Sequence, residues 1–148
     1  MPDETALLIA DVFEAAGSLR RLGDHTARAE GLTQTRWQLL STVSRDPLTA
    51  SQAARRLGTS RQSVQRVAND LVAFRLAAYE PNPDHRGSPL LALTSRGQEV
   101  LGRVTDRAAR VHRTLLSAIP DEDIRATRVC LRQLLSALDY DEGAAGSR

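Results

Sequence analysis

The segment Leu48–Ala77, LTASQAARRLGTSRQSVQRVANDLVAFRLA, contains two short helical patterns separated by the tight link LGTS. Thr49 and Gln52 have the T-x-x-Q spacing of a capping box, which predicts that the first helix begins directly after Thr49. Gly58 stands where that helix would end in the left-handed conformation. Because two short helices joined this tightly can pack in few ways, this segment constrains the fold more than any other.

The second helix of this segment has one apolar and one polar face, and Thr59 or Ser60 caps its start. The apolar stripe is narrow and consists of Val64, Val67, Ala68 and Leu71. Opposite it, and at the N-terminal end, lie Arg61, Gln62, Gln65, Arg66, Asn69 and Ala73. Long side chains that carry both donors and acceptors suit the edges of bases in a major groove.

After this helix the helical spacing of apolar residues ends and short extended runs follow. LAAYE and PLLALT are short extended runs on either side of PNPDHRGS, whose Pro, Asn, Asp and Gly predict a turn or a longer hairpin loop. His85 and Arg86 lie at its tip. A further helix, capped by Thr33, precedes the segment and carries Trp37. The middle of the chain therefore follows the order helix, helix, helix, hairpin of a winged helix-turn-helix.

Long helical patterns flank this middle part, and Ser95 with Gln98 predicts the cap of the first one after the hairpin. The predicted flanking helices cover residues 5–29, 96–119 and 122–139. Their apolar stripes are broader than one small domain can bury, which predicts that they also form a dimer interface.

We therefore expect a mainly α fold with a small β-hairpin. It would comprise a winged helix-turn-helix over residues 32–95, a helical dimerisation region over 5–31 and 96–140, and a flexible tail over 141–148.

Charge is distributed unevenly along the 148 residues, and every basic residue other than histidine is an Arg. The net charge is −3 over residues 1–31, +5 over 32–96 and 0 over 97–148. A basic centre favours a polyanionic partner for that segment, although Arg also decorates helix surfaces without binding anything.

The single cysteine, Cys130, excludes an internal disulfide and fits a reducing cytoplasm. We expect it to be a buried structural thiol rather than a redox sensor.

Early acidic residues argue against a secretory leader, and no apolar run of about 18 residues could span a membrane. His25, His85 and His112 are scattered and show no metal-ligand spacing with Cys130. No nucleotide-binding or hydrolase motif occurs, so we expect neither an enzyme nor a bound cofactor or metal.

Three motifs resemble those of the MarR family of bacterial transcriptional regulators. GLTQTRWQLLSTV resembles the family's L-T-x-x-x-W-x-x-L-x-x-L helix, and Leu48–Ala77 resembles its helix-turn-helix region. PDHRGSPLLALTSRGQEVL, which is the most specific match, resembles the family's D-x-R wing followed by L-T-x-x-G. The resemblance covers roughly residues 5–140. The family often has Gly after the recognition helix, whereas Arg75 or Leu76 stands there, so a left-handed cap is not expected.

The resemblance implies a homodimer that binds a pseudo-palindromic operator on double-stranded DNA, commonly as a repressor released by a small-molecule effector. It also implies that Arg86 reaches the minor groove and is held by Asp84. Trp37 would border the ligand cleft of the family, although a lone Trp is more often a core residue. The alternative function is a winged-helix protein-interaction module without DNA binding, for which a polar face without Arg and a neutral wing would be expected.

The candidate DNA-binding residues share exposed positions on the predicted recognition helix, on its flanks or on the wing. They are Arg36, Ser60, Arg61, Gln62, Ser63, Gln65, Arg66, Asn69, Asp84 and Arg86. Several have a simpler alternative: Ser60 and Ser63 as helix caps only, Gln65 as an ordinary surface residue, Asn69 as a phosphate contact, and Arg36 as either a phosphate contact or a solvated side chain.

Overall fold

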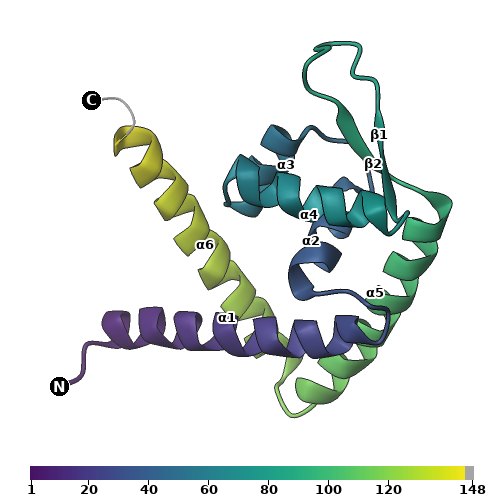
Figure 1. Ribbon diagram of the computed structural model, residues 1–148. Coiled ribbons are helices and arrows are strands. Elements are labelled where there is room, and N and C mark those ends of the chain that lie inside the picture. Colours follow the sequence, from purple (N-terminus) through teal and green to yellow (C-terminus); the bar gives the residue numbers. More distant parts are fainter. Residues whose placement is uncertain (146–148) are drawn as a thin grey trace. The chain divides into compact units, whose positions relative to one another are not determined.

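The computed structural model describes the backbone of residues 1–145 and the side chains of residues 1–139. The elements follow one another as α1 (Glu4–Arg28), α2 (Gln34–Val43), α3 (Ala50–Leu57), α4 (Arg61–Ala73), β1 (Ala77–Glu80), β2 (Leu90–Leu93), α5 (Ser95–Leu115) and α6 (Asp121–Ala145) (Figure 1). The chain divides into two compact units, Met1–Ala109 and Arg110–Arg148. The expected fold class, mainly helical with one hairpin, is confirmed.

The helix boundaries in the first unit follow from side-chain caps. The hydroxyl of Thr33 accepts the N–H of Arg36 at the start of α2. Thr49 and Gln52 form the complete capping box of α3, which ends at Gly58 with φ +63°. Each of these boundaries agrees with the sequence-based prediction.

The core of the first unit is formed mainly by α2 and α4. Leu39 and Leu40 of α2 and Val64 and Leu71 of α4 are at most 2% exposed. Val104 of α5, which follows the hairpin in the chain, is fully buried and joins this core. This core holds α4 by its apolar stripe and leaves the opposite face of α4 to solvent.

The hairpin is antiparallel and pairs Ala77 with Leu93 and Tyr79 with Leu91. Leu48, just before α3, forms an isolated bridge with Leu91. The N–H of Leu48 donates to the carbonyl of Leu91 at 3.2 Å, and the N–H of Leu91 donates to the carbonyl of Leu48 at 2.7 Å. The loop between β1 and β2 extends beyond α3 and α4 (Figure 1). The base of the wing is therefore fixed to the helix-turn-helix, while its tip projects from it.

The end of α4 differs from the expectation. Arg75 adopts φ +61°, and the N–H groups of Arg75 and Leu76 donate to the carbonyls of Val72 and Leu71 at 3.0 and 2.9 Å. This is a Schellman cap with an Arg in the left-handed position, so the prediction that no such cap forms here is wrong. The buried Leu76 that follows it requires the chain to turn at this point, and packing outweighs the backbone cost.

Because a non-glycine residue in the left-handed conformation is strained, we expect Arg75→Gly to be more stable than Arg75→Ala by about 1 kcal/mol. Urea unfolding followed by circular dichroism measures the difference. Both variants remove the Arg75 side chain, but only glycine relieves the strain of the left-handed backbone. The difference between them therefore measures the backbone strain alone. Equal stabilities of the two variants would show that Arg75 is not strained.

Boundaries of the flanking helices also differ from the prediction. The first helix after the wing begins at Ser95 because the hydroxyl of Thr94, rather than that of Ser95, accepts the N–H of Gly97 at 3.0 Å. That helix ends at Leu115 instead of residue 119, and α6 continues to Ala145 instead of residue 139. Residues 141–145 of the expected tail are thus helical, and residues 146–148 lie outside the described residues. Among the described residues, no helix is long and apolar enough to cross a membrane.

Candidate nucleic-acid interface

The outward face of α4 carries the polar residues that the sequence singled out. Arg61, Gln62, Arg66 and Asn69 are exposed, and Gln65 is half-buried. Arg61, Gln62 and Arg66 form no ion pair or side-chain hydrogen bond within the described part of the chain. Their donors and acceptors are therefore available to a partner.

Ser60 and Ser63 organise the first turn of this helix. The hydroxyl of Ser60 accepts the backbone N–H of Ser63 at 3.1 Å and donates to the hydroxyl of Ser63 at 2.9 Å. The helix cap is thus Ser60 rather than Thr59, and the hydrogen bonds of Ser60 and Ser63 are those of a helix cap.

Gln65 and Asn69 are joined to the wing by a residue that the sequence analysis did not select. The hydroxyl of Tyr79, on β1, lies 2.6 Å from Nε2 of Gln65 and 2.9 Å from Oδ1 of Asn69. A tyrosine in a short strand gives no signal of such a contact, because the contact depends on how the strand packs beside α4.

The wing tip is ordered by Asn82 rather than by the expected pair of Asp84 and Arg86. The side-chain oxygen of Asn82 accepts the N–H of Asp84 at 3.0 Å, and its Nδ2 donates to the carbonyl of Ser88 at 2.9 Å. In the described residues the ion pairs are Arg36–Asp70 and Arg103–Glu30, so the expectation that Asp84 holds Arg86 is wrong. Arg86 is exposed and has its guanidinium free of any carboxylate of the described residues.

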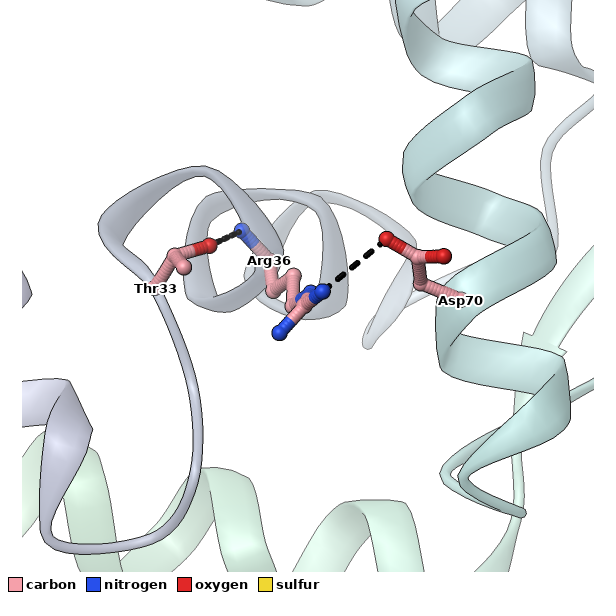
Figure 2. Close-up of polar contacts among 3 residues, drawn as sticks. All are labelled: Thr33, Arg36 and Asp70. Atoms are coloured by element: carbon pink, nitrogen blue, oxygen red, sulfur yellow. Dashed lines mark hydrogen bonds and ion pairs between the residues drawn. The ribbon is translucent and has the colours of Figure 1, made fainter.

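Arg36 contacts α4 instead of being free in solvent. Figure 2 shows its guanidinium pointing to Asp70, with Nη2 at 3.0 Å from Oδ2, and its N–H on the hydroxyl of Thr33. The guanidinium also lies 5.0 Å from the ring centroid of Phe74. The contact joins two residues that are 34 positions apart in sequence, which local spacing cannot reveal. Arg36 therefore supports the position of α4, a role that neither sequence alternative contained.

Two other selected residues have clear positions. Trp37 is half-buried and packs against the hydrophobic core, which favours its interpretation as a core residue. Cys130 is exposed on α6, so the expectation of a buried thiol is wrong for this chain.

Comparisons with known proteins agree with this geometry. A protein-family model for the MarR family matches residues 30–86. The uncharacterised protein Rv2011c of Mycobacterium tuberculosis is 56% identical over 138 residues, covering 93% of this chain and 96% of that protein. The transcriptional activatory protein BadR of Rhodopseudomonas palustris is 30% identical over 146 residues, covering 91% of this chain and 81% of that protein.

A solved structure of a MarR family transcriptional regulator from Streptomyces coelicolor superposes with a TM-score of 0.80 at 26% identity, covering 93% of this chain and 97% of the other. The chain belongs to the MarR family of transcriptional regulators. Members of this family are DNA-binding proteins rather than enzymes, so the resemblance seen in the sequence and the expectation of no enzymatic activity are both confirmed.

Proposed function

We propose that this protein is a homodimeric repressor that binds a pseudo-palindromic operator in the cytoplasm and is released by a small molecule. The observation that carries the proposal is the free polar face of α4, where Arg61, Gln62 and Arg66 have no partner among the described residues, next to a wing with an unpaired Arg86. The helix face would enter the major groove and the wing tip the adjacent minor groove. Three of the other candidates, Ser60, Ser63 and Asp84, would contact phosphates or support the residues that do.

Exposed apolar side chains support the homodimer. On α1, Phe13 is 75% exposed and Leu19 is 53% exposed. On α6, Val129 is 58% exposed and Leu138 is 53% exposed. Large apolar side chains repeated along a helix usually mark an interaction surface, and a second copy of the chain would cover them. A two-fold dimer would then place two copies of α4 about 10 base pairs apart.

A cavity of about 540 Å³ supports the response to a small molecule, because that volume is within the range of ligand pockets. Phe74 and Arg75 at the end of α4 and Arg96 and Arg103 of α5 line it. The carboxylate of Glu30 accepts a hydrogen bond from Arg103 at 3.1 Å and raises the pKa of that guanidinium. A small anion bound here would contact the residues that terminate α4 and could shift the helix. Trp37 lies outside the lining of this cavity.

The test is selection of bound sequences from randomised duplex DNA, followed by titration of the selected site. We expect two chains per duplex by sedimentation and at least about a thousandfold tighter binding than to a scrambled duplex. A reporter gene behind the selected site then gives the sign of regulation, which matters because the relative BadR is named an activator. Equally weak binding to every duplex would contradict the proposal and favour the protein-interaction module.

A further inference from the structure

The cavity at the end of α4 is lined by three arginines and one carboxylate, and the arginines do not have equal surroundings. Arg103 of α5 donates to the carboxylate of Glu30 at 3.1 Å, so its charge is compensated. Arg75 and Arg96 form no ion pair or side-chain hydrogen bond in the part of the chain that the structure describes. Two guanidiniums of the cavity therefore carry uncompensated positive charge.

The two unpaired arginines are brought to one end of the cavity by Thr94. The hydroxyl of Thr94 donates to the backbone carbonyl of Arg75 at 2.7 Å, and Arg96 follows two residues later in the first turn of α5. Arg103 lies seven residues after Arg96, which is about two helical turns along α5. The carboxylate of Glu30, which would repel an anion, is therefore held away from Arg75 and Arg96.

Arg75 stands at a position where glycine would be the less strained residue. Its φ of +61° belongs to the left-handed region, which disfavours every residue with a Cβ. The burial of Leu76 explains why the chain turns here, but glycine would make the same turn. Strained residues of this kind are concentrated at ligand-binding and switch sites. Because the Arg75 side chain is exposed and lines the cavity, its strain points to a bound partner of the guanidinium.

A phosphate monoester fits two guanidiniums better than a carboxylate does. An arginine binds an oxyanion through two parallel hydrogen bonds, so one arginine is enough for the two oxygens of a carboxylate. A phosphate monoester has three terminal oxygens and a charge of about −1.5 to −2 at pH 7. It therefore matches a pair of arginines both in the number of acceptors and in charge.

The remaining lining of the cavity is mostly apolar. Phe74, Leu76 and Val100 line it together with the arginines. The volume of about 540 Å³ leaves room for more than a phosphate group and lies in the range of small-molecule sites. A ligand that fills the cavity thus carries an apolar part beside its charged group, which favours a small organic molecule over the backbone of a DNA duplex.

We propose that Arg75 and Arg96 bind the phosphate group of a small organic phosphate monoester. The apolar part of this ligand packs against Phe74 and Val100. The inference rests on the proposed response to a small molecule and adds the chemical class of that molecule. Since the four residues Ala73–Leu76 at the end of α4 line the cavity, we expect the bound ligand to weaken operator binding, and the operator to weaken ligand binding by the same factor.

The experiment is isothermal titration calorimetry of the full chain at constant ionic strength and about pH 7.5, where a phosphate monoester carries nearly two charges. The probes are phenyl phosphate, phenyl sulfate, benzoate and inorganic phosphate. Phenyl sulfate keeps three terminal oxygens with a single charge, benzoate has two oxygens, and inorganic phosphate lacks the apolar part. We expect phenyl phosphate to bind about tenfold more tightly than each of the other three.

Arg75→Gln and Arg96→Gln each remove one guanidinium and keep a long polar side chain. Each should weaken the binding of phenyl phosphate by about tenfold. Arg110→Gln removes the same charge from an exposed position of α5 outside the cavity lining, and it should bind phenyl phosphate like the wild type. Arg75→Gly relieves the backbone strain and should still lose the ligand, which excludes unfolding as the cause.

The outcomes separate this inference from the proposed function. Equal affinities for the four probes, or wild-type affinity in the variants of Arg75 and Arg96, would refute the assignment and leave operator binding by α4 untouched. Glutamine variants that bind no phenyl phosphate and also show a shallower salt dependence on DNA would make the two arginines DNA phosphate contacts, which refutes it as well. Binding of phenyl phosphate as expected, with operator affinity unchanged, would confirm the site and contradict the proposed release.

Discussion

Replacing Gly97 by alanine is expected to lower the free energy of unfolding by about 3 kcal/mol, the largest stability loss that we expect from a single methyl group in this chain. A Cβ at position 97 would lie 1.9 Å from the carbonyl oxygen and 2.9 Å from the carbonyl carbon of Leu76. That carbonyl cannot simply move away, because it accepts the N–H of Thr94 at 3.1 Å and Leu76 is only 4% exposed. The first turn of α5 would have to separate from the end of α4.

Gly102 on the same helix provides the matched control, since nothing lies within 4 Å of a Cβ built there. Gly102→Ala should leave the stability unchanged or raise it by up to about 1 kcal/mol, because alanine is the better helix former. Urea unfolding of both variants gives the comparison. A Gly97→Ala variant within about 0.5 kcal/mol of the wild type would show that α5 and Leu76 do not approach this closely.

Gly97 also shows what the sequence can and cannot reveal. Its place in the L-T-x-x-G pattern is visible in the sequence. A glycine is required there because a Cβ would collide with the carbonyl of Leu76, which precedes the hairpin in the chain. The helix starts at Thr33 and Thr49 could be predicted because a cap and its helix are neighbours in the chain. Local signals therefore place the elements, and contacts between elements remain hidden.

The candidate interface shows the same division. The polar face of α4 follows from helical periodicity alone, so its exposed members could be chosen from the sequence. The partners of Arg36 and Gln65 could not, because Asp70 and Tyr79 reach them through the packing of α2 and β1 against α4. Closeness in sequence also fails to predict ion pairs at the wing. Asp84 and Arg86 are two residues apart and form no ion pair among the described residues.

The second large effect that we expect is a loss of DNA affinity, which should differ between variants of α4 and variants of the wing. Arg66 is exposed on the polar face of α4, where a guanidinium can bind a guanine edge through two hydrogen bonds. We expect Arg66→Ala to weaken operator binding by about 1–3 kcal/mol and to relax base preference at one position per half-site. Binding to scrambled DNA should change much less.

Arg86→Ala is expected to act differently because Arg86 carries only donors and lies on the wing. The minor groove distinguishes mainly A·T from G·C pairs, so a guanidinium there adds affinity with little sequence information. Operator and scrambled DNA should both bind more weakly, and the slope of log K against log salt should become shallower by about one per arginine lost. Since Arg86 is not paired with Asp84, no ion pair has to be broken before it binds.

The measurement is a salt titration of the wild type and the two variants on the operator and on scrambled DNA. Arg110→Ala removes the same charge from an exposed position on α5 and controls for net charge. If Arg66→Ala lowered affinity equally for all sequences while Arg86→Ala changed a single base preference, the two roles would be reversed. That result would place the wing, rather than the free face of α4, in the position that reads the operator, because only a side chain at a base edge can change the preference at one position alone.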